Sequence, residues 1–294
     1  MREQHNRPHA EQRQRRSSRS VKTPEPITLG KNTSINVLYE DQQLLAIDKP
    51  AGWLVTTPKW SHTKQNLQRE IEIAIQVRDH WVKRRQLKFL RFVHRLDRET
   101  SGVLLLAKNR TVLTNVSQDF AEQRVEKLYL CQVHGIPAME EWQCDAPIAK
   151  GSKDQPQVKI DRRGGLPAST LFRVLAKAQN TALVLAAPKT GRTHQIRIHL
   201  SAAGHPIVGD SLYAPQEKDL TRQLALRAWA LALPATRHRN PVLIEAPSRS
   251  FAKHVSSEVR LPTADQAFKD IYRASQSEDL LVTRTGRLSK ATGV

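Results

Sequence analysis

A single carboxylate, Asp97, lies between two arginines just ahead of an apolar run, and these neighbours make it the best candidate in the chain for a catalytic group. Residues 94 to 109 read HRLDRETSGVLLLAKN, so Arg95 and Arg98 flank Asp97. A carboxylate that is buried away from water needs a cationic or hydrogen-bonding partner, which these arginines can supply. An ionised carboxylate can act as a nucleophile or a general base. The alternative is a structural ion pair between Asp97 and a neighbouring arginine.

The residues after Asp97 predict the element that positions it. Val103 to Ala107 have the length and branched composition of a buried strand. Thr100, Ser101 and Gly102 would form the tight entry to that strand. We therefore expect Asp97 on a loop that leads into a rigid sheet, a place where catalytic groups are often found.

Four blocks of sequence resemble the RluA-type pseudouridine synthases. HRLDRETSG is similar to that family's signature, and three further blocks fall in the family's order: LAIDKPAGWLV at 45–55, RVEKLYLCQVHG at 124–135 and GRTHQIRIHLSAAGHPIVGDSLY at 191–213. Together they frame residues 37 to 262. The resemblance implies an RNA isomerase that converts uridine to pseudouridine without a cofactor, with Asp97 as the catalytic residue.

The block GRTHQIRIHLSAAGHP first suggests a metal site, because it holds three histidines. Thr193 can cap a helix that Gly204 and Pro206 terminate. His194 and His199 would then point about 140° apart around the helix, which is poor geometry for sharing an ion. The HExxH zinc pattern does not occur. We therefore expect no metal site.

The same helix predicts a position for Arg197. Ile196, Leu200 and Ala203 would face the core, while Arg197 would lie on another face, one turn from Thr193. An arginine there could be a solvated surface charge or could project toward a site. The resemblance implies that Arg197 pairs with the catalytic Asp97, and Arg192 is the second choice for this role.

Two further side chains have both a structural and a functional interpretation. Tyr129, in KLYLCQ, could be a core aromatic, but it shares a strand face with Lys127 and Cys131, opposite its apolar neighbours. The resemblance implies that Tyr129 stacks on the substrate base. Arg95 could neutralise Asp97, or, as the resemblance suggests, enter the nucleic-acid stack in place of an extruded base.

The charge of the chain indicates a polyanionic partner. The 294 residues contain 47 Lys and Arg against 28 Asp and Glu, which gives a net charge of +19, and nucleic acid is the expected partner. Residues 83 to 98 mix basic and aromatic side chains, which suits either a nucleic-acid groove or a solvated helix face. No stretch is apolar enough to span a membrane, no signal-peptide core begins the chain, and two cysteines support no zinc site. We expect a cytoplasmic monomer.

The pattern of elements predicts the domains and the fold class. Residues 1–34 contain eight cations against three acids and few large apolar side chains, which predicts a disordered basic arm. Residues 35–263 would form the catalytic domain, and residues 264–294 a short helix and a polar tail. Strands at 44–47, 103–107, 127–133, 168–176 and 181–187 alternate irregularly with helices at about 67–85 and after Asn109. This order favours an α+β fold with a large mixed, mainly antiparallel sheet and flanking helices, and the resemblance implies the same.

Two other classes of function stay open. A non-catalytic RNA-binding or ribosome-associated protein on the same fold would have the same charge. A hydrolase could use His94, Ser101 and Asp97, although no GxSxG motif is present. Among RNA substrates, the sequence is compatible with both ribosomal and transfer RNA, and we favour ribosomal RNA slightly.

Overall fold

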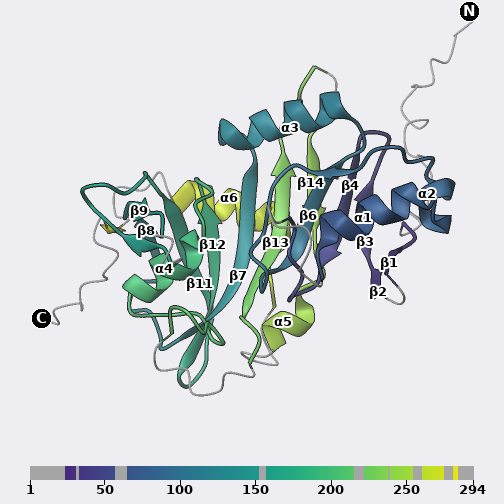
Figure 1. The fold of residues 1–294 in the computed structure, drawn as a ribbon. Coiled ribbons are helices and arrows are strands. Elements are labelled where there is room, and N and C mark those ends of the chain that lie inside the picture. The colour runs from purple at the N-terminus through teal and green to yellow at the C-terminus, as the bar shows by residue number, and fades with distance from the viewer. Residues whose placement is uncertain are drawn as a thin grey trace, which may run out of the picture.

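A large mixed sheet forms the centre of the structure (Figure 1). The computed structural model describes residues 24–30, 33–56, 65–151, 157–214, 222–237, 239–253, 260–274 and 281–283. The strands of the sheet follow the order β15-β8-β11-β12-β7-β13-β6-β4-β3, with β14 paired to β13 and β5 paired to β6. The pairs are antiparallel except for β13–β6 and β15–β8. The predicted α+β fold with a mainly antiparallel sheet is confirmed.

The elements alternate irregularly along the chain. The first half contains β1 (Ile27–Leu29), β2 (Thr33–Ile35), β3 (Val37–Glu40), β4 (Leu44–Lys49), α1 (Leu67–Gln76), α2 (His80–Arg84), β5 (Arg91–Phe92), β6 (Ser101–Ala107), α3 (Arg110–Ala121), β7 (Glu126–His134) and β8 (Glu141–Cys144). The second half contains β9 (Ile148–Ala149), β10 (Lys159–Ile160), β11 (Thr170–Lys177), β12 (Thr181–Pro188), α4 (Gln195–Ala202), β13 (Leu226–Leu233), β14 (Val242–Glu245), α5 (Arg249–Lys253), α6 (Ala264–Ala274) and β15 (Leu281–Thr283).

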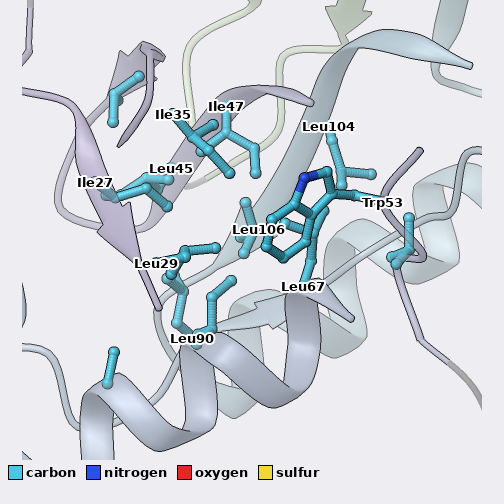
Figure 2. Packing of buried hydrophobic residues seen from close by; sticks show 14 of the residues in the cluster. Ile27, Leu29, Ile35, Leu45, Ile47, Trp53, Leu67, Leu90, Leu104 and Leu106 are labelled. Atoms are coloured by element: carbon cyan, nitrogen blue, oxygen red, sulfur yellow. The ribbon is translucent and has the colours of Figure 1, made fainter. Parts of the chain in front are cut away.

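The period-two pattern of the strands divides the core between the two faces of the sheet. On one face, α1 packs on β4 and β6 through Leu67 and Ile71, in the cluster drawn in Figure 2. On the same face, Ile196 and Leu200 of α4 pack on β7, β8, β11 and β12. Tyr129 contacts both clusters, so the two helices flank the middle of the sheet. We call this side the front face.

The opposite face is covered by α3, α5 and α6. Alternate residues of β4 and β6 pack on Val112 and Val116 of α3, and Leu128 and Leu130 of β7 pack among side chains of α5 and α6. Asn109 caps α3, as predicted, by accepting a hydrogen bond from the Val112 amide. Because both faces are covered, the central strands are apolar almost throughout and hold the front face rigidly.

Three predicted boundaries differ from the structure. The helix predicted over 67–85 is two helices, because Arg78 adopts a left-handed conformation (φ 53°) between α1 and α2. The predicted basic arm ends earlier than residue 34, because β1 and β2 form a hairpin that buries Ile27, Leu29 and Ile35 in the core (Figure 2). At the other end, the predicted helix is present as α6, and Leu281–Thr283 pairs with β8 where a tail was expected. Residues 1–23, 275–280 and 284–294 lie outside the described residues.

Candidate active site

Asp97 lies at a cavity of about 400 Å³ on the front face of the sheet. Its side chain is 18% exposed, whereas the preceding Leu96 is buried in the α1 cluster and anchors the loop. The cavity is bounded by this loop, the end of α3, β7 and the segment that leads into α4. The sequence prediction that Asp97 lies on a loop ahead of a buried strand is therefore confirmed by β6.

A buried lysine holds the loop that carries Asp97. The Lys49 side chain is fully buried, and its ammonium donates to the carbonyls of Arg98 (2.8 Å), Thr100 (2.7 Å) and Pro50 (3.0 Å). Burial lowers the pKa of Lys49 to about 8. The Gly52 amide also donates to the Arg98 carbonyl. The segment DKPAG thus fixes the loop through its backbone carbonyls.

Arg197 is the cation that faces Asp97, and it is itself fixed by a second carboxylate. Its Nε and Nη2 donate to the two oxygens of Asp210 at 2.8 and 2.7 Å. Both side chains are buried. The third nitrogen, Nη1, lies 4.0 Å from Asp97 Oδ2 and has no hydrogen-bond partner. Burial alone would lower the pKa of Arg197, but the hydrogen bonds and charge of Asp210 raise it, so the guanidinium stays charged.

His194 approaches the other oxygen of Asp97. Its Nε2 lies 3.9 Å from Asp97 Oδ1, and its Nδ1 lies 2.9 Å from the hydroxyl of Tyr213. That hydroxyl already accepts from the Val158 amide, so its own hydrogen is available for Nδ1. Burial lowers the pKa of His194, which favours the neutral ring. Asp97 therefore faces a nitrogen of His194 at one oxygen and a nitrogen of Arg197 at the other.

The start of α4 differs from the sequence prediction. His194, not Thr193, occupies the position before the first residue of the helix. It has a left-handed conformation (φ 51°), and its side chain makes no capping hydrogen bond. Thr193 is exposed and is not stacked on Arg197 within the helix. Ile196, Leu200 and Ala203 are buried as predicted. His199 is also buried and hydrogen-bonds to Thr170 and the Ala146 carbonyl, so it is a structural residue.

Tyr129 and Arg95 line the same cavity as Asp97. Tyr129 projects from β7 between the two front clusters, and burial followed by the Asp97 charge raises the pKa of its hydroxyl. Arg95 is exposed at the cavity edge. The structure therefore brings together Asp97, Arg95, Tyr129 and Arg197.

Two arginines considered as partners of Asp97 point elsewhere. Arg98 is exposed and donates to the Gly52 carbonyl, which serves the shape of the loop. Arg192 lines the cavity but donates to the Pro167 carbonyl through Nε. Of the four arginines near the loop, only Arg197 comes within 4.0 Å of the Asp97 carboxylate in the described part of the chain.

The structure does not bring together His94, Ser101 and Asp97, the residues of the hydrolase alternative. His94 accepts a hydrogen bond from the Leu105 amide and stacks on Phe120, and burial lowers its pKa to about 3. Ser101 hydrogen-bonds to Arg227, and neither residue contacts Asp97. Within the described ranges, no group of three or more His, Cys, Asp or Glu could hold a metal ion, and none of the helices has the length and apolar character to cross a membrane.

The basic and aromatic stretch 83–98 is mainly structural. Trp81 is buried in the α1 cluster and Phe92 packs against it, so neither ring is available to stack on a base. Arg84 and Arg85 pair with Glu25 and Glu40. Phe89 is half-buried and lies outside this cluster, with Arg110 Cζ 5.8 Å from its ring centroid. Base stacking by this stretch therefore stays a prediction for Phe89 alone.

Comparison with known proteins places the chain in a family with this architecture. The profile of the RNA pseudouridylate synthase family matches residues 43–202. The chain therefore belongs to the RNA pseudouridylate synthase family, whose members are isomerases that act on RNA. The resemblance drawn from the four sequence blocks is confirmed.

Particular relatives narrow the family to the RluA type. The chain is 39% identical over 208 residues to ribosomal large subunit pseudouridine synthase C of Buchnera aphidicola from Schizaphis graminum, covering 70% of this chain and 62% of that relative. It is 31% identical over 214 residues to dual-specificity RNA pseudouridine synthase RluA of Escherichia coli K12, covering 72% of this chain and 92% of the relative. The solved structure of human RNA pseudouridylate synthase domain containing 1 superposes with a TM-score of 0.63 at 26% identity, over 81% of this chain and 94% of that one.

Sequence reasoning missed four residues that build the site. Lys49, His194, Asp210 and Tyr213 all lie inside the blocks that carried the resemblance. Asp210 follows Gly209 in a turn, and its Oδ1 accepts from the amides of Leu212 and Tyr213. An Asp that begins such a turn was a signal for a structured carboxylate, but its pairing with Arg197 depends on the tertiary fold.

Proposed function

We propose that this chain isomerises uridine to pseudouridine in a structured RNA, with Asp97 as the catalytic carboxylate. The observation that carries the proposal is the position of Asp97 at a front-face cavity, with the buried Arg197 guanidinium 4.0 Å from one oxygen and His194 3.9 Å from the other. Arg197 and His194 thus place a nitrogen about 4 Å from each oxygen of this carboxylate, where a cation attracts a carboxylate.

The reaction requires such a carboxylate next to the sugar. The glycosidic bond between N1 and C1′ breaks, the detached uracil turns while held in the pocket, and C5 bonds to C1′. C5 then loses its proton and N1 gains one, so the atoms balance without a co-reactant. Asp97 can attack the sugar carbon or remove a proton, and both routes need the ionised form.

The other residues act by holding the nucleotide. Tyr129 projects into the cavity and would stack on the uracil once it has left the RNA helix. Arg95, at the cavity edge, would take the place of the extruded base, since a planar cation can stack and hydrogen-bond there. Arg192, exposed beside the cavity, would contact the RNA backbone. These roles require the target uridine to be flipped out, because Asp97 lies inside the cavity.

The proposal also specifies which RNA is the substrate. The net charge of +19 suits a phosphate-rich partner. One relative is named as a ribosomal large subunit synthase and another as a dual-specificity RNA synthase. We propose ribosomal RNA as the main substrate and transfer RNA as the second candidate.

The test is to incubate the purified chain with unmodified ribosomal and transfer RNA and then map pseudouridines in both. We expect a new pseudouridine at one or a few positions of ribosomal RNA. RNA binding with no pseudouridine in either RNA would instead support the non-catalytic RNA-binding alternative. Mapping RNA from a strain that lacks the gene would then show whether the same position depends on the chain in cells.

A further inference from the structure

Lys127, on β7, lines the active-site cavity. It lies two residues before Tyr129 on the same strand and the same face, and both side chains line the cavity. Residues two apart on a strand are separated by about 7 Å. Leu128, between them, points to the opposite face and packs there. The cavity lined by Asp97 and Tyr129 therefore also contains a primary ammonium.

This ammonium has little compensation for its burial. The single hydrogen bond that the Lys127 ammonium donates in the described structure is a long one, 3.4 Å, to the Thr190 carbonyl. No carboxylate of the described residues pairs with it. By contrast, Lys49 has three carbonyl acceptors within 3.0 Å, and Lys108 pairs with Glu40 at 2.8 Å. Burial lowers the pKa of Lys127 to about 8, with no opposing anion.

An underpartnered ammonium inside a cavity calls for an anionic ligand. A lysine binds phosphate as a point charge, and its attraction is stronger where water is excluded. An RNA nucleotide that enters this cavity brings a phosphodiester with its base and sugar. The spacing between Tyr129 and Lys127 is of the size of one nucleotide.

We propose that Lys127 forms a phosphate subsite, which binds a phosphodiester oxygen next to the uridine whose base enters the cavity. This inference rests on the proposed function. Tyr129 then holds the base, Asp97 meets the sugar and Lys127 holds the backbone, so the nucleotide is fixed at three points. The subsite serves binding of the extruded nucleotide, and Lys127 takes no part in bond breaking.

The test uses a short RNA that contains the mapped target uridine, with a neutral methylphosphonate placed in turn at each flanking linkage. Lys127→Met, Lys127→Arg and the wild type are compared by kcat and KM for pseudouridine formation. Lys88→Met is the matched control, because Lys88 is an exposed lysine and its loss removes the same charge outside the cavity.

We expect Lys127→Met to raise KM about 10-fold to 100-fold with little change in kcat, as for loss of a charge-assisted hydrogen bond. Lys127→Arg should keep much of the affinity, and Lys88→Met should change KM only slightly. One methylphosphonate linkage should weaken the wild type to a similar degree and should cause no further loss in Lys127→Met.

Several results would overturn the subsite. If every methylphosphonate weakens Lys127→Met as much as it weakens the wild type, Lys127 contacts no phosphate. If kcat falls while KM stays unchanged, Lys127 acts on the base or on the reaction. If Lys127→Met does not fold, a wild type that tolerates every neutral linkage still refutes the subsite. If the wild type forms no pseudouridine in any RNA, the proposed function itself is refuted. This outcome differs from the results that refute only the subsite.

Discussion

Replacing Arg197 by Met removes both contacts of its guanidinium. The substitution keeps the length of the side chain but removes both hydrogen bonds to Asp210 and the charge beside Asp97. We expect two separate losses, one in stability and one in turnover, and each can be given a size from the structure.

The loss of turnover follows from the distance to Asp97. Two unit charges 4.0 Å apart interact with about 4 kcal/mol at an effective dielectric constant near 20. If the reaction depends on that interaction, kcat should fall by up to about three orders of magnitude. The loss of stability follows from Asp210, which is completely buried and would lose its cation. Breaking a buried pair in this way costs about 3–5 kcal/mol.

Asp210→Asn is the variant that distinguishes the two losses. It removes the buried carboxylate but leaves the charge of Arg197 beside Asp97, so stability should fall as in Arg197→Met while kcat falls by only about tenfold. Arg192→Met is the matched control, because Arg192 lines the same cavity without pairing with Asp97. Urea unfolding measures stability, and release of tritium from uracil labelled at C5 measures turnover. An Arg197→Met protein with near-normal kcat would refute the reasoning.

Three further predictions concern the parts that support the site. Lys49→Met should lower kcat by at least about tenfold and destabilise the fold, since the carbonyls of Arg98 and Thr100 lose a charged donor; unchanged kcat would show that the loop holds its shape alone. Burial lowers the pKa of His199 to about 4 in the folded state, below the roughly 6.5 of an unfolded histidine. As the pH drops from 6.5 to 4, the unfolded state therefore binds a proton that the folded state does not, and this histidine should lower the unfolding free energy by roughly 3 kcal/mol. His199→Gln should flatten that dependence in urea unfolding, and an equal slope in both proteins would assign it to other groups. Deleting residues 1–23 should leave the modified position unchanged and make the salt dependence of RNA binding shallower; a redirected modification would make the arm a specificity element. Deletion through residue 34 should also unfold the front core, because it removes Ile27 and Leu29.

Local sequence patterns predicted the elements that carry the site better than they predicted its contacts. The apolar run after Gly102 predicts a buried strand, and the apolar spacing around Arg197 predicts a helix with that residue off its core face. Both patterns depend on neighbours in the chain. Charges next to each other in sequence were a poorer guide, because Arg98 donates to the Gly52 carbonyl while Arg197 approaches Asp97 from another element.

The remaining contacts depend on distances that no local pattern contains. Lys49 meets the loop of Asp97 because β4 and β6 pair with Lys49 opposite Gly102. Asp210 meets Arg197 because the turn after α4 folds back on the helix. The hairpin of β1 and β2 escaped prediction because each strand has only three residues and the surrounding sequence is polar.

The central claim is that Asp97 carries out the isomerisation. The most direct measurement is tritium release from RNA labelled at uracil C5, comparing the wild type with Asp97→Asn, together with RNA binding by both proteins. Asn has almost the same size as Asp but no charge, so the cavity and the phosphate contacts should be retained. The account predicts release by the wild type, none above background by Asp97→Asn, and RNA affinities within a few-fold of each other. Tritium release by Asp97→Asn at a rate close to that of the wild type would contradict it.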